Sequence, residues 1–233
     1  MEKAWSSPRA KFILALVISS LVSILLFAYR AVHDHSLYFD YLSWNLILAW
    51  LPLVFAVRLS LVLKHKLWSS WEALILSFLW LIFLPNSFYM ISDFIHIQDF
   101  AQVDLIYDTT MITSFIYTGV ALGFSSLYLI HLDLKKRFSP RASAEFIALT
   151  LFISSVAMYF GRDLRWTSWN VFTNPGGLLF DLSNRITHVF SYPDMVIEVI
   201  GFFVLLCAIY NLIWQAANLL AHRRGIGPLL DSD

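Results

Sequence analysis

The sequence predicts an all-α polytopic membrane protein built as a bundle of six transmembrane helices. The chain of 233 residues is 59% apolar and only 14% charged, which is too apolar for an ordinary water-soluble domain. It contains six apolar stretches near the roughly 20 residues that cross a hydrocarbon core about 30 Å thick. Basic residues gather in alternate connections between these stretches. We therefore expect one membrane domain over residues 1–233.

The predicted spans follow the apolar stretches in order. They cover approximately residues 12–29, 43–63, 71–91, 109–132, 143–160 and 195–220. The first stretch follows Lys11 and has some likeness to a signal peptide, but it is long for one, and Ala28-Tyr29-Arg30-Ala31 is a poor cleavage site. We expect it to be kept as the first helix.

The basic residues predict the orientation of the helices. The chain has 16 Lys and Arg residues, and most lie at the two ends or in the second and fourth connections. These are Lys3, Arg9, Lys11, Arg58, Lys64, Lys66, Lys135, Lys136, Arg137, Arg141, Arg223 and Arg224. The positive-inside rule places them in the cytoplasm, together with both termini. The other connections are rich in aspartate, so we expect a functional site to face outward.

The longest connection, residues 161–194, is too polar to cross lipid. Apolar residues recur in it at helical spacing, opposite polar ones, and the segment Asn174-Pro175-Gly176-Gly177 precedes them as a turn. The apolar set is Leu178, Leu179, Leu182, Ile186, Val189 and Phe190. This pattern predicts an amphipathic helix lying in the membrane interface.

A polar stripe follows the third span. Pro85 removes one helical hydrogen bond, which predicts a kink or break. If the helix resumes, Asn86, Tyr89, Asp93 and His96 share one face that runs from the outer surface into the bundle. Asn45, near the outer end of the second span, is a further candidate for this cluster.

Asp93, His96 and Asp108 allow three interpretations. Two carboxylates and one imidazole can hold a divalent metal such as zinc. The same groups can act as a general acid and base. They can also cap helix ends by hydrogen bonding, without any chemistry, and the sequence does not separate the three.

Arg162 and Arg165 are candidates for binding an anion. They belong to the few basic residues predicted outside, with Arg30 and Arg185, and two guanidinium groups can hold a phosphate or carboxylate. The alternative is an aromatic belt with basic anchors at the lipid headgroups, as nearby tryptophans suggest. Both interpretations stay open.

Other features disfavour particular classes of function or indicate helix packing. A net charge of zero gives no support for nucleic-acid binding, and the single cysteine, Cys207, excludes an intrachain disulfide. Gly119 and Gly123 predict close helix packing, whereas His131, at the predicted cytoplasmic end of the fourth span, suggests a solvated helix end. The sequence has no nucleotide-binding glycine loop and no Gly-x-Ser-x-Gly nucleophile motif.

Short motifs occur in order over approximately residues 40–220. They are Asn45, Trp50-Leu51-Pro52, Leu84-Pro85-Asn86, Tyr89, Asp93, His96, Tyr107-Asp108, Gly161-Arg162, Arg165-Trp166, Ser168-Trp169 and Thr173-Asn174-Pro175. This ordered set resembles a bacterial multi-pass membrane family known as domain of unknown function 1361. The resemblance implies a bacterial plasma membrane and no particular activity. The family pattern usually has Asn and Asp where this chain has Thr167 and Asn170, so neither position is a candidate for essential acid chemistry.

Two hypotheses follow from these residues. In the first, an outward pocket binds or processes an anionic or lipid-linked envelope substrate. The arginines, with Asn86 and Tyr89, hold the anion, and Asp93, His96 and Asp108 act as acid, base or metal ligands. In the second, the chain is a non-catalytic accessory subunit or a small-solute permease, and the same residues brace its helices. The lipid bilayer is the only partner that both hypotheses require.

Overall fold

The computed structural model is all-helical over its described residues, 8–35, 37–93, 105–164 and 166–223. Six of its helices are long and apolar enough to cross a membrane, which confirms the predicted class. They are α2 (Pro8–Asp34), α3 (Asp40–Val62), α4 (Trp71–Tyr89), α5 (Leu105–Lys135), α6 (Pro140–Asp163) and α9 (Pro193–Arg223). The predicted site residues His96 and Arg165, and the charged residues Lys3, Asp99, Asp104 and Arg224, lie outside the described ranges.

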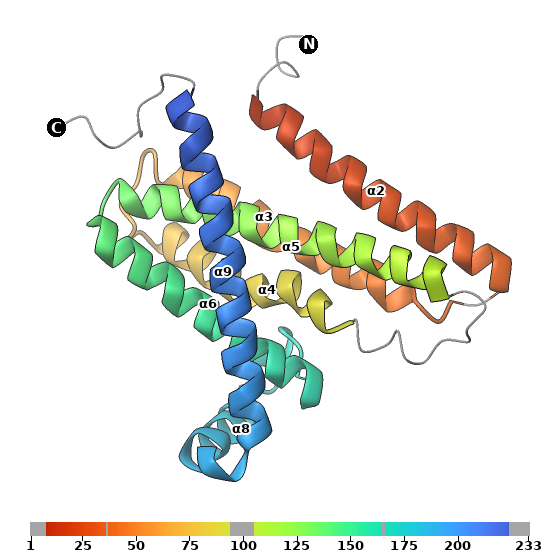
Figure 1. Ribbon diagram of the computed structural model, residues 1–233. Coiled ribbons are helices and arrows are strands. Elements are labelled where there is room, and N and C mark those ends of the chain that lie inside the picture. The colour runs from red at the N-terminus through yellow and green to blue at the C-terminus, as the bar shows by residue number, and fades with distance from the viewer. Residues whose placement is uncertain (1–7, 36, 94–104, 165, 224–233) are drawn as a thin grey trace.

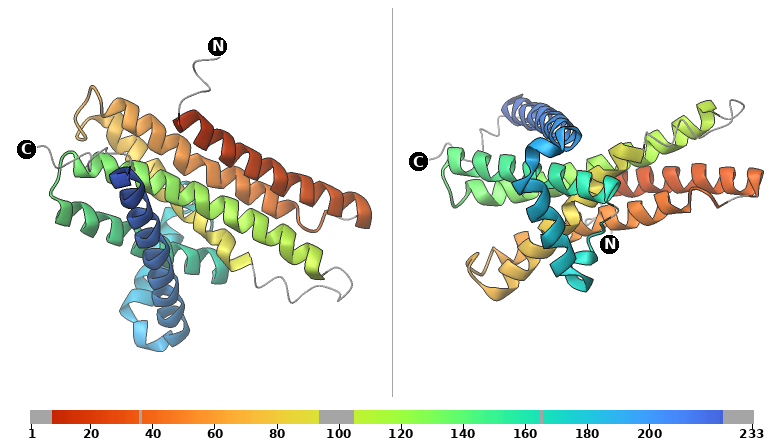
Figure 2. Two further views of the ribbon diagram at one scale, coloured as in Figure 1. Left: turned by 45° about the horizontal axis from the view of Figure 1, so that its top comes forward. Right: turned by 90° about the horizontal axis from the view of Figure 1, so that it is seen from below.

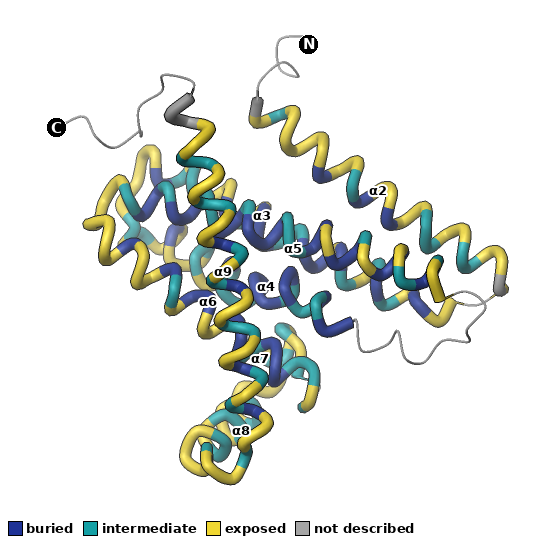
Figure 3. Tube along the Cα trace, in the orientation of Figure 1, coloured by how far each residue is buried: buried dark blue, intermediate teal, exposed yellow. Residues whose placement is uncertain are grey.

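The helices form an irregular bundle with α5 at its centre. In the most apolar part of α5, 61% of the residues are buried, whereas the corresponding share is 17% in both α2 and α9. α3 packs extensively against α4 and α5, α2 packs against α5, and α6 packs against both α4 and α9. Figure 1 shows α9 crossing the other helices steeply, and Figure 2 shows the same crossing from two further sides. Figure 3 shows long exposed stretches along α2 and α9, as expected for helices with one face toward lipid.

The ends of the helices extend past most predicted spans by a few residues. α5, for example, begins at Leu105 and includes Asp108, whereas the apolar stretch begins at residue 109. A count of apolar residues stops at the first charge, but a charged side chain remains helical where it finds a partner or reaches the headgroups. α4 continues unbroken through Pro85 to Tyr89, and a 3-10 turn then reaches Asp93. Of the kink or break predicted at Pro85, the break is absent, because the helix is continuous there.

The segment between α6 and α9 is folded, as predicted. It contains α7 (Asn170–Thr173), α8 (Pro175–Thr187) and the 3-10 helix η2 (Val189–Ser191). The expected turn at 174–177 is the first turn of α8 instead, because the Asn174 side chain accepts a hydrogen bond of 3.1 Å from Gly177 N and Pro175 occupies the first helical position. In Figure 1 this segment lies at the end of the molecule opposite the start of α2 and the end of α9.

Candidate functional site

A serine from the segment before α7 fastens that segment to α4. The Asn86 amide donates to Ser168 Oγ at 2.8 Å, and Ser168 Oγ donates in turn to the Ile82 carbonyl at 3.0 Å. Ile82 lies three residues before Pro85, in the turn where the proline ring crowds the backbone carbonyls. The carbonyl that loses its helical donor to Pro85 is that of Leu81, so Ser168 bonds to the backbone one residue farther along, and Asn86 holds its hydroxyl in place.

α4 approaches α3 and α5 closely near the same turn. Ser87 Oγ donates to the Ala49 carbonyl of α3 at 3.2 Å, and Ala49 lies three residues before Pro52. On the other side, a Cβ added at Gly123 would lie 2.8 Å from both Ser87 Cβ and Phe88 Cε1. A Cβ at Gly119 would meet Met90 Sδ at 2.4 Å. These contacts confirm the packing predicted for the two glycines, because only residues without a side chain permit this approach.

Asp108 forms a buried ion pair with Arg30, which joins α5 to α2. Asp108 is fully buried, and Arg30 has a side-chain exposure of 14%. Arg30 Nε and Nη2 donate to the two carboxylate oxygens at 2.6 and 3.1 Å, a fork-to-carboxylate geometry that fixes both partners. Tyr107 adds a hydrogen bond of 2.8 Å to the Leu26 carbonyl of α2. The arrangement matches the interpretation of Asp108 as a structural partner.

Asp93 is the predicted site residue with unused hydrogen-bonding capacity. Its exposure is 3%, and Asn45 of α3 forms a hydrogen bond with its side chain. Its second oxygen, Oδ2, is buried and has no hydrogen-bond partner among the described residues. The α-helix ends at Tyr89 and a 3-10 turn carries Asp93, so the α-helical spacing that would align Asp93 with Asn86 is not kept. A buried carboxylate oxygen without a donor favours a proton or a ligand there.

Arg162 binds carboxylates of the chain itself. It forms an ion pair with Glu198 of α9, and its Nε lies 3.4 Å from Asp163 Oδ1. Tyr89 lies against the same end of α6, where a Cβ at Gly161 would meet the Tyr89 ring at 3.1 Å. The structure thus brings Asn86 and Tyr89 to the contact of α4 with the segment before α7 and with α6, whereas Arg162 joins α6 to α9.

The segment that carries α8 has one polar bond within itself and one to the bundle. Within it, Trp166 Nε1 donates to Asp181 of α8 at 2.9 Å. Arg185 donates to the Tyr159 hydroxyl of α6 and stacks on Tyr192, with its guanidinium carbon 4.5 Å from the ring centre. The predicted apolar set is divided between two sides. Leu178, Leu182 and Val189 pack against core residues of α6 and α9, whereas Leu179, Ile186 and Phe190 are exposed, Phe190 at 98%.

The described residues contain no group of three or more His, Cys, Asp or Glu side chains arranged to hold a metal ion. His96 lies outside them, so the site of Asp93, His96 and Asp108 stays a prediction. Asp108 already has both oxygens bonded to Arg30, and a metal ligand role would require it to leave that pair.

At the other end of α5, His131 is buried, although the sequence suggested a solvated helix end. His131 Nδ1 lies 2.7 Å from the Tyr210 hydroxyl of α9, and the imidazole stacks on Trp214 at 4.1 Å between ring centres. α9 supplies this cover from 79 residues farther along the chain, so neither spacing nor hydropathy within α5 indicated it. The contact joins α5 to α9 rather than exposing a titrating group.

The sequence analysis identified the polar residues of the site but not the residues to which they bond. Glu198, Ser168 and Arg30 were not among the candidates, yet they bind Arg162, Asn86 and Asp108. One signal was available, because a carboxylate within a membrane span needs a counter-charge and Glu198 lies in the sixth apolar stretch.

The fold defines a helical multi-pass membrane protein whose polar residues cluster at the ends of α4, α5 and α6. The family model "Protein of unknown function (DUF1361)" matches residues 44–209, and the chain belongs to this family. Comparisons with curated proteins and with solved structures give no match.

Proposed function

We propose that the chain is a non-catalytic accessory component of the bacterial plasma membrane, with both termini in the cytoplasm. In this proposal the polar residues at the outer helix ends brace the helices against one another, and Asn86 holds the segment of residues 166–192 against the bundle with its other face free. The observation that carries the proposal is that Asn86, Asp108 and Arg162 each bond to a residue of another segment. Side chains bonded in this way position helices and are poorly available to a substrate.

The proposed orientation rests on the distribution of charge. Basic residues at the start of α2 and in the connections after α3 and α5 favour the cytoplasm, and the connections rich in aspartate favour the outside. Reporter fusions active only outside the membrane should give signal after Thr187 and none after Lys66. Signal from both fusions, or the reverse pattern, would refute this orientation.

The bracing role can be tested with Asn86→Ala and Arg162→Ala. Each variant should lower the melting temperature in detergent and make residues 166–192 more sensitive to protease, because a bond to that segment or to α9 is lost. Arg141→Ala is the matched control, since its ion pair with Glu145 is exposed on one helix. If either variant keeps normal melting and protease resistance but fails to complement a deletion strain, the residue acts on a ligand and the proposal fails.

Asp93 supports a second candidate function, the binding or processing of an anionic or lipid-linked envelope substrate. Its buried Oδ2, which has no donor among the described residues, is the specific observation in favour. Metal analysis of the purified protein beside an Asp93→Ala/His96→Ala double variant tests the metal form of this candidate. Near-stoichiometric zinc that disappears in the double variant would support a metal-dependent enzyme, and absence of metal from the folded protein would exclude that form.

A further inference from the structure

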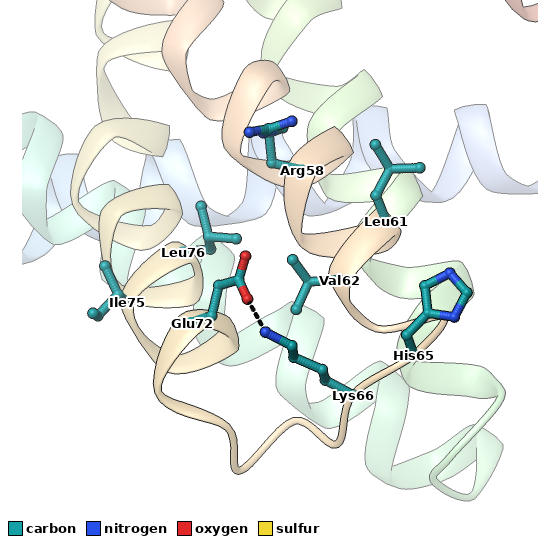
Figure 4. Close-up of a pocket in the computed structure, with 8 residues that line it drawn as sticks. All are labelled: Arg58, Leu61, Val62, His65, Lys66, Glu72, Ile75 and Leu76. Carbon is teal, nitrogen blue, oxygen red and sulfur yellow. Dashed lines mark hydrogen bonds and ion pairs between the residues drawn. The ribbon is translucent and has the colours of Figure 1, made fainter.

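A groove lies between the end of α3 and the start of α4, beside the connection of residues 63–70. It has a volume of about 630 Å³, within the usual range for ligand sites of about 300–1,000 Å³. Figure 4 shows Arg58 at one end of the groove and the Lys66–Glu72 ion pair at the other. Val62 and Leu76 lie between them on facing helices. The groove is at the opposite end of α4 from Asn86 and Asp93.

Arg58 is a charged residue on an apolar, exposed face of a membrane-spanning helix. Val54, one turn before it, and Leu61, about one turn after it, are 48% and 47% exposed. Arg58 lies four residues before the end of α3 at Val62, which places its backbone about 6 Å inside the helix end at 1.5 Å per residue. Among the described residues, Arg58 has no hydrogen bond or ion pair. A guanidinium at this depth next to lipid requires an anion or must reach the headgroups.

The other charges of the groove balance each other. Lys66 and Glu72 form an ion pair across the connection between α3 and α4. Their charges cancel, so Arg58 leaves the groove with an excess positive charge. The ion pair offers both a donor and an acceptor to neutral hydroxyl groups.

Apart from Arg58, the Lys66–Glu72 ion pair and His65, the residues that line the groove are apolar. Leu61 and Ile75, from α3 and α4, are about half exposed, at 47% and 54%. A site for a free phosphate ion needs donors on several sides and gains nothing from such walls. A site that combines one guanidinium with apolar walls suits a phosphate attached to hydrocarbon chains.

From these contacts we propose that the groove binds an anionic phospholipid with a hydroxylated, uncharged headgroup, such as phosphatidylglycerol. The phosphate contacts Arg58, the headgroup hydroxyls reach Lys66 and Glu72, and an acyl chain lies against Leu61 and Ile75. A headgroup with an ammonium group would compete with Lys66 for Glu72, which disfavours zwitterionic lipids. This site is independent of the bracing role proposed for the other end of the bundle.

Native mass spectrometry of the full chain in detergent tests the proposal. The protein is titrated with phosphatidylglycerol or with phosphatidylcholine of the same acyl chains, and retained lipids are counted. Phosphatidylglycerol should bind more tightly, and Arg58→Ala should weaken it about tenfold or more, the loss expected for about 1.4 kcal/mol of a charge-assisted contact. Lys64→Ala is the matched control, because Lys64 is an exposed basic residue of the same connection that does not line the groove.

Arg58→Lys checks that any loss does not come from misfolding, since it keeps the charge and should retain part of the preference. Equal binding of the two lipids, or equal loss in Arg58→Ala and Lys64→Ala, would overturn the proposal. Glycerol 3-phosphate, a phosphate ester without acyl chains, is added as a competitor in the same experiment. If it displaces phosphatidylglycerol at comparable concentration, the groove is a site for soluble phosphate esters and the lipid assignment is wrong.

Discussion

Removal of Arg30 should destabilise the protein more than any exposed charge does. Arg30→Ala leaves the Asp108 carboxylate fully buried between α2 and α5 with both hydrogen bonds to the guanidinium lost. Breaking a buried ion pair from one side costs about 3–5 kcal/mol, because the remaining charge is neither solvated nor paired. For a chain of this size, about 3 kcal/mol corresponds to a fall in melting temperature of roughly 6–12 °C.

The assay is thermal unfolding of the purified protein in one detergent, with two comparisons. Arg141→Ala removes an arginine of an exposed pair, at 90% and 65% side-chain exposure, and should melt near the wild-type temperature. Arg30→Met combined with Asp108→Leu removes both charges and should recover most of the lost stability. The reasoning is refuted if Arg30→Ala melts like wild type. It is also refuted if the double variant loses as much stability as the sum of the losses in Arg30→Met and Asp108→Leu alone.

Three further predictions test helix contacts by the same melting assay. Gly123→Ala should cost about 1–3 kcal/mol because its Cβ would overlap Ser87 and Phe88, whereas Gly201→Ala, with open space around the new Cβ, should not destabilise. Asn86→Ala and Ser168→Ala should show a coupling of about 1 kcal/mol in a double-mutant cycle, and zero coupling would contradict their hydrogen bond. Tyr210→Phe should cost about 1–2 kcal/mol by leaving buried His131 without that partner.

Sequence reasoning recovers the six helices because hydropathy and helix length depend on the same physical limit, the thickness of the bilayer. It misplaces helix ends where a charge finds a distant partner. α5 begins before Asp108 because Arg30 of α2 pairs with that carboxylate from 78 residues away. It also misplaces the start of α8, where the Asn174 cap and Pro175 begin a helix in a segment rich in turn residues.

The candidate site was harder to predict because residue type indicates that a group is polar but not what satisfies it. The sequence analysis named Arg30 only as one of the few basic residues predicted outside. The pairing of Arg162 with Glu198 depends on how α6 packs against α9. The sequence of either helix does not indicate that packing. In a membrane such pairs are expected, since an unpaired charge is costly there, but the choice among several acidic partners is made by packing.

Near each of the two prolines inside α3 and α4, a serine of another segment bonds to the helix backbone. Each proline removes the hydrogen bond to the carbonyl four residues before it, and in each case a serine from another segment donates to the next carbonyl along the helix: Ser87 to Ala49, and Ser168 to Ile82. The two contacts form a series, since α4 supplies the hydroxyl for α3 and the segment before α7 supplies the hydroxyl for α4. A change in the position of that segment would therefore expose a carbonyl in α4. The attachment of the segment before α7 and the hydrogen bonding of the α4 backbone therefore depend on each other.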